Sequence, residues 1–177
     1  MTSVLQVPSY KGTLAKLPRD RRGAFVAHLR RIIWEAMEVP SRPSRKRIPD
    51  PPSPAQLDLA AWACAACGGE CCSKGGTHAY LDDDTIHRVA RERPRLSRRE
   101  LAELYTACLP LESFAGSCVF HGAEGCTLPR ALRSDLCNSF YCTPLKRFFR
   151  DEPEAVVGDI RIEAVTERTA PKGTDTR

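Results

Sequence analysis

Long hydrophobic runs are missing from this chain of 177 residues. Its uncharged apolar stretches fall far short of the roughly 20 residues that a membrane-spanning helix needs. The first residues also lack the basic segment followed by an apolar segment that marks a secretory signal. We therefore expect a soluble protein of the cytoplasm, with no membrane partner. In that reducing compartment clustered cysteines are metal ligands or redox groups more often than disulfides.

Familiar catalytic and nucleotide-binding motifs are missing as well. The sequence contains no GxSxG elbow, no HExxH pair and no P-loop. It also has no glycine-rich strand-to-helix turn for a nucleotide or for S-adenosylmethionine. No set of residues suggests acid–base or nucleophilic catalysis, so the sequence leaves open whether the protein is an enzyme.

Cysteine, in contrast, is abundant. The chain has 9 cysteines, well above ordinary usage for this length. Zinc sites and iron–sulfur clusters each take four thiolates, so two groups of cysteines predict a metal-binding protein. The expected ligands, in sequence order, are Cys64, Cys67, Cys71, Cys72, Cys118, Cys126, Cys137 and Cys142.

The first group has the spacing Cys-x-x-Cys followed by an adjacent pair. Two thiolates separated by two residues can chelate one ion from a tight turn, and Gly68 and Gly69 let the backbone N–H groups approach the sulfurs. Side chains of neighbouring residues diverge, so we expect Cys71 and Cys72 to serve different metals, or one of them to pack or bridge. The zinc ribbon needs two such knuckles and this chain has one. An iron–sulfur cluster is thus slightly favoured over zinc, although spacing does not choose between them.

Three other candidate ligands receive different interpretations. Cys108 falls on the apolar stripe of an expected helix, which favours a core position. His78 and His121 lie near cysteines and could bind metal, but surface or packing histidines are the commoner case.

The positive net charge of +5 is concentrated before the cysteines. Residues 1–56 carry 11 Lys/Arg against 4 Asp/Glu, while the rest carry 16 against 18. A basic arm can contact nucleic acid or an acidic partner, although a solvated helix and linker is the commoner explanation. Phe25 and Trp34 are the only large aromatics of its helix and suit a buried face, so nucleic-acid binding is the least favoured function.

Composition divides the chain into four sections. They are a basic helical segment (1–39), a proline-rich linker (40–56), a cysteine-cluster metal-binding domain (57–168) and a polar tail (169–177). Apolar residues recur at helical spacing in the first section, namely Phe25, Leu29, Ile32, Ile33 and Ala36. Six prolines between residues 40 and 54 define the linker.

Local signals predict further helices in the cysteine-bearing part. Acidic residues at 82–84 cap a helix of about 84–92, and Ser97 with Glu100 forms a capping box for the next one. The stretch after Pro129 is also expected to be helical, whereas 154–167 fits helix and strand equally well. We expect a small, mainly α, loop-rich, metal-stabilised domain with an N-terminal amphipathic helix.

The ordered cysteines resemble the YkgJ-type cysteine-cluster family, described as a zinc- or iron-chelating domain. The resemblance spans roughly residues 62–145. It is carried by the CxxCxxxCC group at Cys64–Cys72, the acidic helix start Asp82–Asp84, the pair Cys118 and Gly125-Cys126, and the segment Arg130–Cys137. Family members more often have Arg-Pro before the penultimate cysteine, where this chain has Arg133-Ser134, which leaves the form of that turn open.

The resemblance implies metal chemistry without naming a substrate. Members are often described as iron–sulfur oxidoreductases, and a related domain occurs in flagellin lysine N-methylases. Two functions therefore stay open. One is a metal-binding protein with an iron–sulfur cluster or zinc, for which a redox role stays open, with a protein or electron-transfer partner. The other is a structural-zinc module that binds a protein or nucleic-acid partner.

Overall fold

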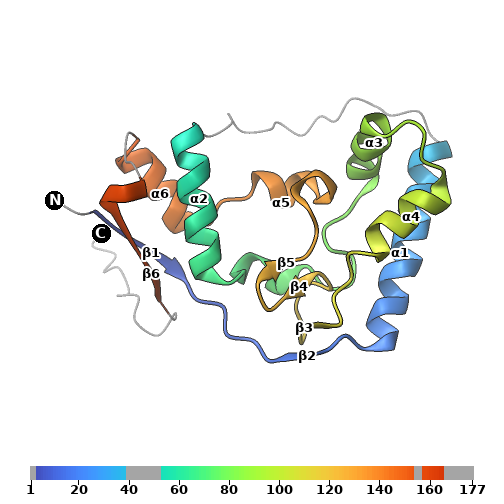
Figure 1. Ribbon diagram of the computed structural model, residues 1–177, viewed down its shortest axis with the longest axis horizontal. Coiled ribbons are helices and arrows are strands. Elements are labelled where there is room, and N and C mark those ends of the chain that lie inside the picture. Colours follow the sequence, from blue (N-terminus) through green and yellow to red (C-terminus); the bar gives the residue numbers. More distant parts are fainter. Residues whose placement is uncertain (1–2, 39–52, 154–156, 166–177) are drawn as a thin grey trace, which may run out of the picture. The chain divides into compact units, whose positions relative to one another are not determined.

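The computed structural model describes residues 3–38, 53–153 and 157–165 (Figure 1). The chain divides into two compact units, each assembled from segments distant in sequence. The first unit comprises Met1–Lys11, Pro52–Glu70 and Tyr141–Arg177, and the second comprises Gly12–Pro51 and Cys71–Phe140. The described residues are rich in helix and carry small two-stranded sheets, so the fold is mixed rather than mainly α.

A parallel strand pair organises the first unit. Strand β1 (Ser3–Pro8) pairs with β6 (Ile160–Val165), which places Leu5 opposite Ile162. Leu5 and Val7 are buried while Val4 and Gln6 are exposed, the period-two pattern of a half-buried strand. Helices α2 (Pro54–Cys67) and α6 (Thr143–Asp151) pack against β1, and α2 also contacts η3 (Val157–Asp159). The core of this unit consists of Leu5, Val7, Leu59, Ala60, Ala63 and Leu145.

Helix α2 begins inside the predicted linker. The Ser53 hydroxyl accepts a hydrogen bond from the Gln56 N–H at 3.2 Å, and the Gln56 side chain accepts one from the Ser53 N–H at 3.0 Å. This capping box, followed by Pro54 in the first helical turn, starts a helix three residues before the predicted domain boundary at 57. Residues 40–52 of the linker and the tail 169–177 lie outside the described residues.

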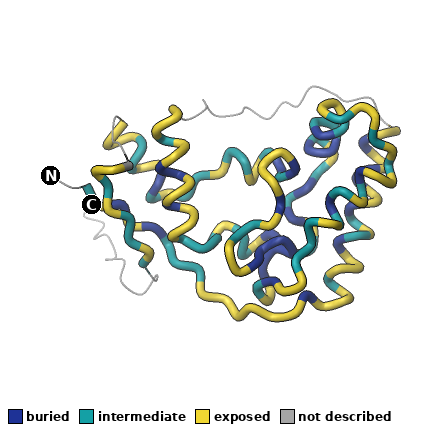
Figure 2. The backbone as a smooth tube through the Cα atoms, in the orientation of Figure 1, coloured by how far each residue is buried: buried dark blue, intermediate teal, exposed yellow. Residues whose placement is uncertain are grey.

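Helix packing forms the core of the second unit. Helix α1 (Arg19–Glu38) lies against α3 (Asp83–Glu92) and α4 (Arg98–Thr106), as Figure 1 shows. Buried residues recur along α1 at helical spacing, with exposed residues between them (Figure 2). Its buried residues are Phe25, Leu29, Ile32, Ile33 and Ala36. The predicted boundaries made this helix a separate section, whereas its apolar stripe belongs to the same core as α3 and α4.

One aromatic residue of α1 was assigned to the wrong face. Trp34 was expected to be buried, but its side chain is 59% exposed. The Arg98 guanidinium lies 4.2 Å from the centroid of the Trp34 ring, so the indole is covered by a cation rather than by the core.

The helix caps predicted for α3 and α4 are confirmed. The Asp82 carboxylate accepts a hydrogen bond from the Thr85 N–H at 3.0 Å. Ser97 and Glu100 form the capping box of α4. None of the helices in the described ranges has both the length and the apolar character needed to cross a bilayer.

Short elements and loops carry most of the cysteines of the second unit. The helical turns are η1 (Glu70–Lys74), η2 (Arg130–Leu132) and α5 (Asp135–Ser139). Strand β2 (Leu14–Lys16) pairs with β3 (Glu112–Phe114), and β4 (His121–Gly122) pairs with β5 (Gly125–Cys126), both antiparallel. These loops border the helical core, which positions the thiols described next.

Candidate metal centre

The eight predicted ligands are divided between the two units. The first unit holds Cys64, Cys67 and Cys142, and the second holds Cys71, Cys72, Cys118, Cys126 and Cys137. We call the second set the thiol cluster. All nine cysteines lie in the described ranges, and none of them forms a disulfide there.

The Cys-x-x-Cys pair lies at the end of a helix rather than in a tight turn. Cys64 and Cys67 occupy the last turn of α2, and residues three apart lie on the same side of a helix. The turn follows at Gly68 and Gly69, whose φ angles are 67° and 92°. It brings the Glu70 N–H to 3.4 Å from the Cys67 sulfur, the kind of N–H approach that the glycines predicted.

Cys142 lies elsewhere in the first unit, at the start of α6. It occupies the N-cap position, and its side chain makes no cap hydrogen bond within the described residues. Cys67 and Cys142 both pack against the core of the first unit. The unit therefore presents two half-buried thiols on one core, with Cys64 exposed at the end of α2.

Cys72 interacts with three other thiols of the cluster, those of Cys71, Cys118 and Cys126. Its pKa is raised far above the ordinary value, first by a hydrogen bond with Cys71, then by burial and by the neighbouring Cys118 and Cys126 thiols. The sequence predicted that the Cys71 and Cys72 side chains diverge, and this is wrong. The backbone at η1 is wound with about three residues per turn, so adjacent side chains can approach each other more closely than on an extended strand.

Two other thiols of the cluster, Cys118 and Cys137, are also held in their neutral form. Cys118 is 7% exposed, and burial raises its pKa to about 12. Removal of solvent also raises the pKa of Cys137, and Cys126 and Cys71 add to the effect. Cys72 interacts electrostatically with Cys71, Cys118 and Cys126, and Cys137 interacts with Cys71, Cys118 and Cys126, so each of the five thiols lies near at least two others.

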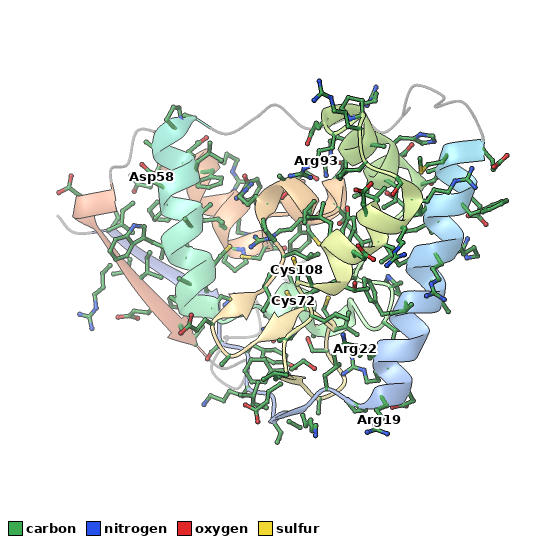
Figure 3. All side chains as sticks on the ribbon, turned by 45° about the vertical axis from the view of Figure 1, so that its right-hand side comes forward. Arg19, Arg22, Asp58, Cys72, Arg93 and Cys108 are labelled. Carbon is green, nitrogen blue, oxygen red and sulfur yellow. The ribbon has the colours of Figure 1, made fainter. Side chains whose placement is uncertain are left out.

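Backbone contacts join residues 72–75 to residues 117–118. The Cys72 carbonyl accepts hydrogen bonds from the N–H groups of Gly75 and Cys118, each at 3.0 Å. A Cβ atom on Gly75 would lie 2.6 Å from the Cβ of Cys118, so only glycine allows this approach. The contact brings the second cysteine group against the adjacent pair. Figure 3 labels Cys72 and Cys108, which both border the core of the second unit.

Cys126 and Cys137 are held by the segment between them. The Arg133 guanidinium donates to the carbonyls of Leu128 at 2.8 Å and Cys126 at 3.4 Å. The Ser134 hydroxyl accepts from the Cys137 N–H at 3.0 Å and caps α5. Ser134 therefore supplies a helix cap at this turn.

Arg88 braces the same segment from α3. Its guanidinium donates to the Asp135 carboxylate at 2.7 Å and to the carbonyls of Ala131 at 2.9 Å and Arg133 at 2.6 Å. The forked group thus fixes the turn that leads into Cys137. Sequence reasoning missed this residue because its partners lie more than 40 positions further along the chain.

Tyr80 is a second residue that the sequence did not single out. Burial raises its pKa, followed by the neighbouring Cys137, Cys71, Cys118 and Cys72 thiols, so the phenol lies beside the thiol cluster. Ala79 and Tyr80 have φ angles of 51° and 56°, an unusual pair of left-handed residues without glycine. Such backbone strain often marks functional sites. The residue types at positions 79 and 80 gave no reason to expect it from the sequence.

The three other candidate ligands occupy distinct environments. Cys108 is half-buried against the core, as predicted, and donates to the Leu104 carbonyl at 3.4 Å. His78 is exposed, and its Nδ1 accepts from the Tyr80 N–H at 3.0 Å. His121 is fully buried, which fits the predicted packing role.

The donor set fits a thiophilic metal by its chemistry. Five thiols within mutual reach are the ligand type that zinc and iron–sulfur clusters take. No three Cys, His, Asp or Glu side chains among the described residues are grouped as a bound metal ion requires. Metal binding would therefore have to draw the sulfurs closer together.

Comparisons with protein-family models, curated proteins and solved structures find no match to this chain. The resemblance to the YkgJ-type family rests on the sequence pattern of the cysteines alone.

Proposed function

We propose that this protein binds metal through its clustered cysteines, in the manner of the YkgJ-type family, and that the ion stabilises the fold. The bound group is an iron–sulfur cluster, slightly favoured, or zinc. The observation that carries the proposal is the thiol cluster, in which five cysteines of one unit lie close enough to raise the pKa values of Cys72, Cys118 and Cys137.

The thiol cluster supplies more sulfurs than one metal centre requires. An iron–sulfur cluster or a structural zinc ion takes four thiolates, and the second unit offers five. Cys64, Cys67 and Cys142 are the remaining ligands, either of a second centre or as extra thiols. When bound, an iron–sulfur cluster supplies electron transfer, whereas zinc supplies cross-linking of the loops.

The protein contributes a scaffold and proton release. Burial and thiol–thiol coupling keep Cys72 and Cys118 protonated, so metal binding must displace their protons and will tighten as the pH rises. Arg88 and Arg133 hold the segment between Cys126 and Cys137 in place. A reducing cytoplasm suits free thiols of this kind.

The test is the content of iron, zinc and acid-labile sulfide in protein purified without oxygen, with an absorption spectrum of the same sample. Iron with matching sulfide and visible absorption that dithionite bleaches reversibly would establish an iron–sulfur protein and justify a search for its electron partner. Zinc without colour would establish the structural-metal alternative. A protein that takes up neither metal would overturn the proposal.

Two cysteine variants make the test specific. Cys72→Ser removes the thiol that interacts with Cys71, Cys118 and Cys126, and it should lower the bound metal to a small fraction of the wild-type content. Cys108→Ser is the matched control, because a serine hydroxyl can also donate to the Leu104 carbonyl and Cys108 is not an expected ligand. Equal metal loss in both variants would contradict the ligand assignment.

The second candidate function is a structural-zinc module that binds a protein or nucleic-acid partner. It is favoured by the loops that carry the thiol cluster, which a structural ion would brace. Nucleic acid stays the less favoured partner, because the exposed Trp34 ring is already covered by Arg98. Colourless, zinc-loaded protein that retains a binding partner after dithionite treatment would support this function.

A further inference from the structure

Two polar side chains are completely buried beside the thiol cluster. Ser117 and His121 both have 0% exposure. The Ser117 hydroxyl oxygen lies 2.7 Å from Nδ1 of His121, a hydrogen-bond distance. Buried polar groups are costly unless they are hydrogen-bonded, so this pair needs a structural reason.

The reason lies at Cys72. The Ser117 hydroxyl is 2.9 Å from the Cys72 carbonyl oxygen, to which it can only donate. Gly75 and Cys118 donate their N–H groups to the same oxygen at 3.0 Å. The Cys72 carbonyl is thus the meeting point of three donors, one of them a side chain.

The serine hydroxyl has a single proton, and this decides the direction of the chain. If that proton goes to the Cys72 carbonyl, the Ser117 oxygen can only accept from His121. If it goes to His121 instead, two bare oxygens face each other at 2.9 Å. Both contacts are satisfied only when Nδ1 of His121 carries a proton and donates.

The orientation of the imidazole is set by its surroundings. The Phe114 ring lies 4.6 Å from the His121 ring, centroid to centroid. The Arg21 guanidinium of α1 donates to the Ser117 carbonyl, which anchors the residue that the histidine contacts. The His121 strand β4 is in turn paired with Cys126 on β5.

We propose that His121 is a positioning residue, protonated at Nδ1, that acts through Ser117 to fix the Cys72 carbonyl and with it the Cys71–Cys72 pair. The metal-binding part of this inference rests on the proposed function, and the hydrogen-bond direction does not. Residues that orient metal ligands through hydrogen bonds change metal affinity by about 10- to 100-fold when they are removed.

The first experiment is long-range ¹H–¹⁵N NMR of the imidazole in uniformly labelled, metal-free wild-type protein. The inference expects a protonated Nδ1 at His121, assigned by the loss of its signals in His121→Asn. An unprotonated Nδ1 would overturn the direction of the chain. This measurement needs no metal, and the only variant it needs is His121→Asn, for the assignment.

The second experiment compares zinc affinity, by competition with a chromophoric chelator, in His121→Asn, His121→Leu and Ser117→Ala. An asparagine amide N–H can stand where the Nδ1 proton stands, so His121→Asn should stay within about threefold of wild type. His121→Leu and Ser117→Ala should bind zinc about 10-fold more weakly. Ser117→Ala removes only a hydroxyl and keeps the test valid if the leucine variant does not fold.

The outcomes separate the two proposals. Wild-type protein that binds no zinc or iron would overturn the proposed function and, with it, the positioning role. Wild-type binding with unchanged affinity in folded His121→Leu and Ser117→Ala would overturn the positioning role alone. Equal weakening in His121→Asn and His121→Leu, with unchanged affinity in Ser117→Ala, would show that His121 matters only as a ring in the core and would overturn the positioning role.

Discussion

Single residues decide how closely the two cysteine groups can approach. Gly75 has no side chain where Cys118 lies, and any Cβ there would overlap the Cys118 side chain. Its backbone conformation is not the left-handed one that favours glycine, so the requirement at this position is steric. The close approach of Cys118 to Cys72 therefore requires a residue without a side chain at position 75.

Gly75→Ala should destabilise the protein by about 1–3 kcal/mol, the usual range for overpacking, as measured by urea unfolding of metal-free, reduced protein. Gly23→Ala is the matched control, because no atom lies within 4 Å of a Cβ built on Gly23 in α1. The control should stabilise the protein by up to about 1 kcal/mol, since alanine is the better helix former. Equal stability of the two variants would contradict the close packing at Cys118.

The buried thiol of Cys118 predicts how stability depends on pH. Its pKa is raised from 9.0 to about 12 by burial, so between these values the unfolded chain loses this proton while the folded protein keeps it. The stabilising contribution is therefore present below pH 9 and is lost as the pH rises toward 12. Metal-free protein should become less stable from pH 8 to pH 10 by up to about 1.4 kcal/mol per pH unit for this thiol. In Cys118→Ala the slope, from urea unfolding under reducing conditions, should be smaller; an unchanged slope would contradict this assignment.

Among the secondary-structure elements, α3 supports the candidate site through one side chain. Arg88 projects from it and makes three hydrogen bonds to the segment 131–135 that precedes Cys137. The helix therefore supports the segment that leads to Cys137, a predicted metal ligand, although α3 itself carries no cysteine.

Arg88→Ala should destabilise the protein by about 1–2 kcal/mol, because the Asp135 carboxylate and the carbonyls of Ala131 and Arg133 would lose a charged donor. Arg91→Ala on the same helix is the control: this arginine is exposed, with no hydrogen bond or ion pair in the described part of the chain. Thermal unfolding of the two variants checks the prediction. Equal melting temperatures would show that the segment before Cys137 is held by other contacts.

Elements with local signals could be predicted, and those with distant partners could not. Each cap of α3 and α4 is a hydrogen bond between residues three positions apart, so Asp82 and Ser97 were assigned correctly. Helix α2 was missed because the prolines around Ser53 suggested a linker and masked its capping box. Segment 154–167 fitted helix and strand equally, and its pairing with β1 decides for a strand at Ile160–Val165.

The candidate site was predicted in the same uneven way. Cysteine spacing identified the potential ligands, but it could not divide them between two units. That division depends on which segments share a core, as when Cys67 and Cys142 pack against the same apolar residues. Arg88, Tyr80 and Ser117 were missed because their contacts to the thiol segments join distant parts of the chain.

For the molecule as a whole, metal and folding should be coupled. The thiol cluster is carried by short elements and loops, which a bound ion would cross-link. Removing metal with a chelator under reducing conditions should lower the melting temperature by about 10 °C or more, which corresponds to about 3–5 kcal/mol for a chain of this size. Circular dichroism melts before and after chelation, and after metal is restored, measure the effect. An unchanged melt would show that the fold is stable without metal.

The parallel pairing of β1 with β6 bears on how the protein is made in the cell. Ser3 lies opposite Ile160, so the first unit cannot close until the ribosome has synthesised and released residues 160–165. The described helices of the second unit all precede residue 141 and leave the exit tunnel earlier. The second unit can thus fold and offer the thiol cluster to a metal while the first unit, which holds Cys64, Cys67 and Cys142, is still open.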